Sequence, residues 1–449
     1  MRTRSKAMGR YLRRIAASDA GSAMLIVMAC LVILFVVSTM LITSSEFQAI
    51  QSAREVARVR AMNTADAGLN AYLAGLRHDG PGFAFNYPSL GPVATSDGTW
   101  TASIVATQSA FLVTAIGTVS DGAGASFSRT VVSRVSYPSY ADYALMGDCD
   151  INIGSEATFI GKVGSTGRIT NAGKVYADSS MTQAGSLWAG GTVVDQSGSK
   201  PRRTVAVEAP MIHENLGSNW IDFGQISGDY TALQSAATSS STSFANLTGS
   251  GVIGYRVTLN GAYYSLDSVK GNKFTGGLTY TAISGRQNLP IPVSGVLFFD
   301  DDLWVVGSYN HALTIGSSGD IMLTGNILAT NSGSIYTCGL VAQNNVYIPI
   351  AYPASELPDT LKIQAATMAI TGQNGAYFGA GGTLRSKAWF IGSRTYAIAT
   401  GLVQNEGSSS AIGFATRVYD YDQRLDIYTP PGFPVIHNGT LKVLTWQER

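Results

Sequence analysis

The longest apolar stretch of the chain lies near its N-terminus. No charged residue occurs from position 20 to position 45, and the twenty residues 23–42 are nearly all apolar. A helix of about 20 such residues crosses a hydrocarbon layer of about 30 Å. The pattern predicts a membrane-spanning helix. The side chains expected to face lipid or neighbouring helices are Met24, Leu25, Ile26, Val27, Leu31, Ile33, Leu34, Phe35, Leu41 and Ile42.

Beyond residue 45 the apolar positions become periodic. They recur at steps of three and four residues, which is typical of one buried helix face. The positions are Phe47, Ile50, Ala53, Ala57, Ala61, Ala65, Leu69, Tyr72 and Leu76. The charged residues of this segment fall mostly on other faces, and no proline interrupts residues 22–77. We therefore expect one rod of about 84 Å over residues 22–78, with its first half in lipid and its second half against a globular body.

Short strands follow the helix. Gly80, Pro81 and Pro88 break the helical pattern. Residues 99–105, 110–116 and 126–135 alternate between apolar and polar positions and are bounded by glycine-rich turns. These segments predict a small antiparallel sheet in residues 79–140 that covers the apolar face of the helix.

From about residue 143 the sequence consists of short apolar segments separated by glycines. One polar–apolar–large–apolar pattern occurs three times, starting at positions 302, 320 and 345. Recurrence at intervals of about 20 residues is typical of a solenoid whose turns stack in parallel. The predicted fold is therefore α+β, mostly β: the long helix, the small sheet, then an irregular β-solenoid.

The solenoid is expected in two parts, residues 143–199 and 293–428. Residues 200–292 differ in composition and pattern from the two flanking parts. We interpret them as an insertion or side lobe, with a short helix near residues 230–237. Residues 429–449 contain Pro430, Pro431 and Pro434, which cannot donate to a ladder, so this segment is expected to cap the open end.

Charge sets the expected orientation. The first 21 residues contain six basic residues and one acid, a net charge of +5, which favours the cytoplasmic side. The bulk of the chain is then outside. A secretory signal peptide has a shorter apolar run followed by small residues. Here the small residue Gly21 precedes the run.

A basic leader, Gly21 followed by Ser22, and a long apolar helix together resemble a type IV prepilin. More narrowly, residues 21–27 (GSAMLIV), 43–46 (TSSE) and 63–69 (NTADAGL) resemble the N-terminal module of PilX-type pilus assembly proteins, a minor pilin group. Residues 143–195 and 293–448 resemble the glycine-rich β domain of large members of that group, which ends in a proline-rich stretch and a strand.

The resemblance implies cleavage by prepilin peptidase between Gly21 and Ser22 and methylation of the new amine. It also implies partners: the membrane, other pilins and the pilus assembly machinery. Major pilins carry glutamate at the fifth mature position, where this chain has Ile26. Because an apolar side chain cannot form an ion pair with a neighbouring terminal amine, a tip or accessory role is favoured over the shaft.

Composition narrows the remaining functions. A net charge of +1 argues against nucleic acid as a partner. Charged residues make up only 13% of the chain, and 50 glycines indicate many turns and short strands. Cys30 lies in the predicted span. A disulfide between the exported Cys149 and Cys338 is compatible with export but not required.

Few residues suggest chemistry. The four histidines have no metal-ligand spacing. The strongest candidates for calcium ligands are Asp148, Asp150 and residues 300–302. Because side chains alternate along a strand, at most two carboxylates of the triplet lie on one face, whereas calcium needs several converging oxygens. We therefore prefer the interpretation that these acids mark the solvent-facing starts of solenoid rungs. We expect no enzyme activity, cofactor or metal. The alternatives are a membrane-anchored β-helix polysaccharide lyase or hydrolase, and a pilus-independent surface adhesin with an aromatic sugar-binding strip.

Overall fold

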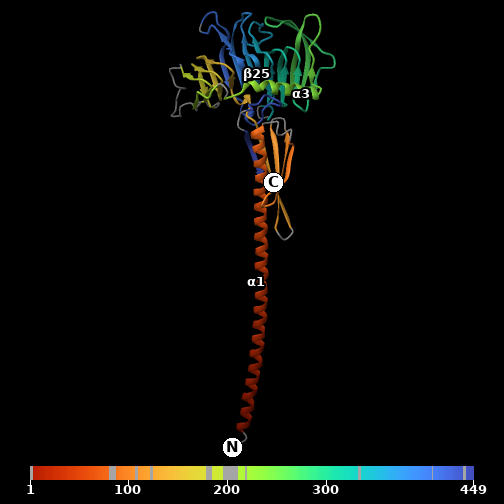
Figure 1. Cartoon of the computed structure of the whole chain (residues 1–449), viewed down its shortest axis with the longest axis vertical. Helices are drawn as coiled ribbons and strands as arrows, with labels where there is room; N and C mark the ends of the chain where they lie inside the picture. Colours follow the sequence, from red (N-terminus) through yellow and green to blue (C-terminus); the bar gives the residue numbers. More distant parts are fainter. Residues whose placement is uncertain are drawn as a thin grey trace.

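The computed structural model describes residues 4–79, 87–106, 110–121, 125–177, 185–195, 211–217, 220–331, 335–406, 408–437 and 441–448. Within these residues the chain forms a long stalk, a small sheet beside the upper stalk, and a broad β-rich head (Figure 1). The predicted break at Gly80 and Pro81 and the sequence 196–210 lie outside the described residues.

The stalk is one continuous helix, α1 (Arg4–Asp79), of 76 residues. It contains the whole predicted helix and begins earlier, within the predicted leader. No proline lies in it to interrupt the i to i−4 hydrogen bonds. The N-terminal half projects away from the rest of the molecule (Figure 1).

The small sheet has five antiparallel strands, in the order β1-β2-β3-β4-β29. Its strands are β1 (Ser89–Ala94), β2 (Thr99–Ala106), β3 (Phe111–Ser120), β4 (Ser126–Ser136) and β29 (Lys442–Glu448). The three strands predicted from alternation correspond to β2, β3 and β4. The last strand corrects the prediction for the end of residues 429–449: β29 pairs with β4, with Val443 opposite Val135, whereas Phe433 and Ile436 before it pack into the core of the head.

The head is built mainly from parallel ladders. The first strands in sequence are β5 (Leu145–Gly147), β6 (Ile151–Ile153), β7 (Ala157–Ile160), β8 (Val163–Ser165), β9 (Ile169–Asn171), β10 (Lys174–Tyr176), β11 (Ser186–Ala189), β12 (Val193–Asp195) and β13 (Met211–His213). The later parallel strands are β19 (Val296–Phe299), β20 (Leu303–Tyr309), β21 (Leu313–Ser317), β22 (Ile321–Ala329), β23 (Cys338–Ala342), β24 (Val346–Pro349), β25 (Thr360–Tyr377), β26 (Leu384–Ile398) and β28 (Ile412–Asp420).

The repeat seen in the sequence sets the register of these ladders. Leu303 lies opposite Ile321, and Ile321 lies opposite Val346, so each copy of the repeat stacks directly on the next. Each strand adds apolar side chains to one continuous core; Leu303, Ile321 and Val346 are all fully buried there. Three short helices lie outside the ladders: η1 (Tyr140–Asp142) lies between β4 and β5, η2 (Phe223–Gln225) precedes the helix that follows β13, and η3 (Gln423–Asp426) follows β28.

The order of the strands in space differs from their order in the chain. β5 pairs with β26 and β7 pairs with β28, so the first part of the head stacks beyond the last strands of the second part. We call this contact the seam. Arg394 lies opposite Leu145, and Tyr419 lies opposite Phe159 across it.

Residues 200–292 belong in part to the same stack, which corrects the interpretation of the whole range as a side lobe. β14 (Ser243–Phe244) and β15 (Val252–Gly261) pair in parallel with β19 and β20. Only β16 (Tyr263–Asn272), β17 (Gly276–Ala282) and β18 (Leu289–Pro290) turn aside as antiparallel strands, as does β27 (Val403–Gln404) near the seam. The predicted short helix is present as α3 (Ile226–Ser239), which runs along the base of the head (Figure 1).

Candidate membrane and assembly helix

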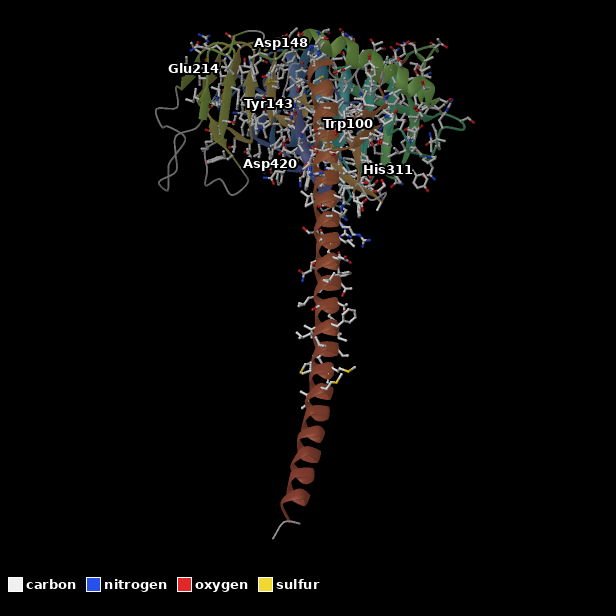
Figure 2. The ribbon with its side chains drawn as sticks, turned by 60° about the horizontal axis from the view of Figure 1, so that its bottom comes forward. Trp100, Tyr143, Asp148, Glu214, His311 and Asp420 are labelled. Carbon is white, nitrogen blue, oxygen red and sulfur yellow. The ribbon has the colours of Figure 1, made fainter. Side chains whose placement is uncertain are left out.

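The apolar half of α1 is uncovered. Phe35 is 71% exposed and Met24 is 67% exposed, and every predicted lipid-facing side chain that the structure describes is exposed. The helix is long and apolar enough to cross a membrane. Gly21 and Ser22 lie within α1, but the burial of these two residues and of Leu25 lies outside the described set. Figure 2 shows apolar side chains radiating from the helix well below the head.

Polar side chains within this half bond to the helix itself. The Thr39 hydroxyl donates to the Phe35 carbonyl at 3.0 Å, and the Thr43 hydroxyl donates to the Thr39 carbonyl at 3.0 Å. A hydroxyl satisfied in this way does not need water, so it can be placed in a hydrocarbon environment. The Thr39 and Thr43 hydroxyls are therefore compatible with a lipid environment.

The sheet covers less of the helix than the periodicity predicts. From Ala57 onward the predicted face is buried, with Ala57 only 3% exposed and Ala61 and Ala65 fully buried. Phe47 and Ile50 are 62% and 51% exposed, and Ala53 is also exposed. These three positions correct the prediction: they extend the uncovered apolar surface past the span. The charged residues Arg54, Glu55, Arg58 and Arg60 are exposed on the helix, as expected.

Small residues bring α1 close to the sheet. A Cβ atom added to Gly117 of β3 would lie 2.2 Å from the Ala61 carbonyl oxygen and 2.4 Å from the Ala65 nitrogen. Trp100 of β2 packs beside this contact, over Gly68 of α1 (Figure 2). Packing this tight leaves no room for an additional methyl group. Above it, the Tyr137 hydroxyl donates to the Leu76 carbonyl at 2.7 Å.

The neck, residues 137–142, joins the stalk to the head and also holds the C-terminal segment. Lys442 of β29 lies 2.6 Å from the Asp142 carboxylate, whose side chain is only 5% exposed. Burial raises the pKa of Asp142, and the neighbouring Lys442 ammonium opposes that rise. The Ser139 hydroxyl donates to the Pro434 carbonyl at 2.9 Å. Two distant parts of the chain therefore meet at the neck.

The C-terminal segment is also attached to α3. Asp229 of α3 accepts from the Val435 amide at 2.9 Å and lies 2.9 Å from the His437 imidazole. The hydrogen bond to Asp229 raises the pKa of His437, although burial opposes it. Sequence reasoning found none of these contacts, because their partners lie more than 200 positions apart.

Asp302, one of the acids considered for calcium, begins a hydrogen-bonded ladder between successive rungs. Asp302 accepts from the Asp320 amide at 2.8 Å, Asp320 accepts from the Asn345 amide at 3.0 Å, and Asn345 accepts from the Gln373 amide at 2.8 Å. Lys273 lies between the Asp302 and Asp320 carboxylates, 2.5 and 2.6 Å away. These acids therefore align the rungs.

The other acids are also engaged. Asp150 accepts from the Arg168 amide at 2.7 Å, and Asp148 accepts from the Thr166 hydroxyl at 2.8 Å. Asp148 and Asp420 lie at different levels of the head, apart from each other (Figure 2). Among the described residues no group of three or more His, Cys, Asp or Glu side chains is arranged to hold a metal ion.

The aromatic and sulfur candidates are dispersed. Trp188 stacks on His213 at 3.7 Å, whereas Trp304 is fully buried in the head and Trp389 lies between Lys362 and Lys387. Among the tryptophans that the structure describes, Trp188 and Trp220 stack on each other, with ring centroids 6.1 Å apart. Cys149 and Cys338 are both free, with Cys338 buried in β23. His311 stacks against Tyr336 and stands apart from Asp420 and Glu214 (Figure 2).

Comparison with known proteins finds no matching family model and no matching curated protein. Among solved structures, the chain is similar to the competence-associated pilin ComZ from Thermus thermophilus, with a TM-score of 0.31, 14% identity, and coverage of 87% of this chain and 97% of that chain. It is also similar to an ice-binding protein from the Antarctic ascomycete Antarctomyces psychrotrophicus, with a TM-score of 0.18, 11% identity, and coverage of 58% and 97%. Likenesses this weak carry no argument about function.

Proposed function

We propose that this chain is a minor pilin-like protein that acts as an accessory or assembly component of a type IV pilus, of the PilX type. The observation that carries the proposal is the division of α1. The apolar side chains that the structure describes between Met24 and Ile50 are exposed, whereas the helix face from Ala57 to Leu76 is buried against a small antiparallel sheet. A membrane anchor alone needs only about 20 apolar residues. A rigid rod that continues into a sheet suits a helix that packs beside other helices.

Assembly in this proposal is a transfer between two apolar surroundings. Prepilin peptidase cuts between Gly21 and Ser22 on the cytoplasmic face, and the new amine is methylated. The exposed face from Met24 to Ile50 then leaves lipid and packs on neighbouring pilin helices at little hydrophobic cost, because both surroundings exclude water. Ile26 removes the ion pair that a shaft subunit would use, which favours a tip or priming position.

The head is the displayed part in this proposal. Its parallel ladders form an irregular β-solenoid outside the cell, held on the stalk by the neck and by β29. We propose a structural or adhesive role without enzyme activity. Of the carboxylates first considered for calcium, Asp302 and Asp150 accept hydrogen bonds from backbone amides of neighbouring rungs, which supports that role.

The test is the intact mass and N-terminal residue of the membrane-extracted protein, in cells with and without prepilin peptidase. We expect a mature chain that begins at methylated Ser22 only when the peptidase is present. Gly21→Glu should block cleavage, whereas Gly9→Glu adds the same charge elsewhere in the leader and should leave cleavage intact.

Two results would contradict the proposal. A mass that retains the 21-residue leader in both strains would leave only a membrane anchor. Unchanged surface display of the Gly21→Glu variant, measured by antibody labelling of intact cells, would instead support an adhesin that is independent of pili.

A further inference from the structure

A partly open cavity of about 170 Å³ lies at the seam, where the first part of the head meets the second. It is lined from both sides, by Leu145 and Phe159 of the first part and by Arg394, Arg417 and Tyr419 of the second. We call it the seam pocket. Its walls combine aromatic rings with two arginines.

Arg394 is a buried cation that its surroundings do not neutralise. The residue is 2% exposed, and its Nε and Nη2 atoms are buried without a hydrogen-bond partner among the described residues. The guanidinium lies over the Phe390 and Tyr419 rings, 4.9 and 5.1 Å from their centroids. Ring faces compensate only a small part of the cost of removing a charge from water. The seam pocket is therefore built around donors that lack an acceptor in the described part of the chain.

The second arginine is already paired. Arg417 is 3% exposed; its Nη2 atom lies 2.5 Å from the Glu406 carboxylate, and its Nη1 atom donates to the Phe414 carbonyl at 3.3 Å. The Glu406 side chain is 34% exposed and forms part of the lining. Two guanidinium groups and one carboxylate give the pocket a formal charge of +1, which matches one monovalent anion.

We propose that the seam pocket binds a small carboxylate monoanion through Arg394. A guanidinium offers parallel N–H donors whose spacing fits the two oxygens of a carboxylate, and such bonds are strongest where water is excluded. The stacked rings of Phe159 and Tyr419, 4.2 Å apart, provide an apolar wall for the carbon end of the ligand. Glu406 holds Arg417 and limits the pocket to a single negative charge.

Binding stabilises the seam. The two parts of the head meet through two short ladders, in which residues 394–396 pair with 145–147 and residues 417–420 pair with 157–160. An anion held between these ladders neutralises a charge that only the joined state buries. Stability of the head therefore rises with ligand concentration, as for any ligand that binds only the folded state.

The experiment uses the full chain in detergent micelles, with sodium acetate as the probe and sodium chloride replaced to keep the ionic strength constant. We expect the head's unfolding temperature to rise saturably with acetate, and acetate binding to be measurable by isothermal titration calorimetry. Arg394→Met should weaken acetate binding by about tenfold or more, since one charge-assisted pair is removed. The control Arg168→Met, an exposed arginine of the neighbouring rung, should bind acetate like the native chain.

A second variant keeps the proposal testable if Arg394→Met does not fold. Glu406→Gln frees Arg417 and raises the pocket charge, so acetate should bind more tightly. Stabilisation that acetate and chloride produce equally, or binding of phosphate but not acetate, would overturn the proposal. So would an Arg394→Met variant that binds acetate like the native chain, since Arg394 would then serve only to pack the aromatic stack.

Discussion

At the scale of single residues, the absence of a side chain decides how α1 meets its sheet. Gly117 faces Ala61 and Ala65, and the backbones approach so closely that no Cβ fits between them. The alanine spacing was visible in the sequence as part of a periodic face. The glycine was not distinguishable there from the many turn glycines, because its partner lies on a different element, far along the chain.

We predict that Gly117→Ala destabilises the docking of α1 on the small sheet. The added methyl group overpacks the contact, at a cost of about 1–3 kcal/mol. The unfolding midpoint of the small sheet, followed by Trp100 fluorescence in the full chain, should fall. Gly228→Ala in α3 is the matched control, because its new Cβ would meet no atom within 4 Å other than the adjacent backbone of its own helix. It should leave the midpoint unchanged or raise it slightly through its higher helix propensity. Equal effects of both changes would contradict the close approach.

At the scale of elements, the C-terminal segment connects α3 in the head with the small sheet, a link that the sequence pattern did not predict. It contacts α3 through His437 and Val435 and then pairs with β4 as β29. Proline residues 430, 431 and 434 correctly indicated that a ladder does not continue through this segment. They did not indicate where the chain goes next, since strand pairing depends on which edge is free.

We predict that the attachment of this segment to α3 weakens as the pH rises. Asp229, through its hydrogen bond, and Asp222, through its charge, raise the pKa of His437 above the ordinary 6.5, so the ion pair stabilises the fold fully below pH 6.5. That contribution is lost as the pH rises through the raised pKa. Its size is no more than about 1 kcal/mol for a partly exposed pair. His437→Asn should lower the unfolding temperature at pH 6 and have little effect at pH 9. A difference that is constant between these values would exclude a titrating pair.

At the scale of the whole molecule, the neck determines how the head is carried on the stalk (Figure 1). Asp142 is almost fully buried there, and Lys442 is the cation beside it. The pair connects the last strand of the small sheet to the first turn below the head. Loss of Lys442 would leave a buried carboxylate uncompensated, which costs more than the pair itself contributes.

We therefore predict that Lys442→Met destabilises the connection between stalk and head by about 3 kcal/mol. Limited proteolysis of the full chain should then cut near residues 137–142 at a higher rate than in the native protein. Lys270→Met removes an exposed lysine of β16 and should leave the rate unchanged. Adding Asp142→Asn to Lys442→Met should restore part of the protection, since the unpaired charge is removed. Persistent sensitivity of the double variant would point to lost packing instead.

Local patterns were enough to predict the span, the continuous helix, the three alternating strands and the recurrence of the rungs. Each of these features rests on neighbours within a few turns or on a short repeat, so the order of side chains specifies it directly. Three other features became known from the folded chain alone: β29 joins the small sheet, residues 143–195 stack beyond the last strands, and Arg394 lies buried at the seam. Those outcomes depend on which strand edges pair although they are far apart in the sequence. One local pattern is compatible with several such pairings.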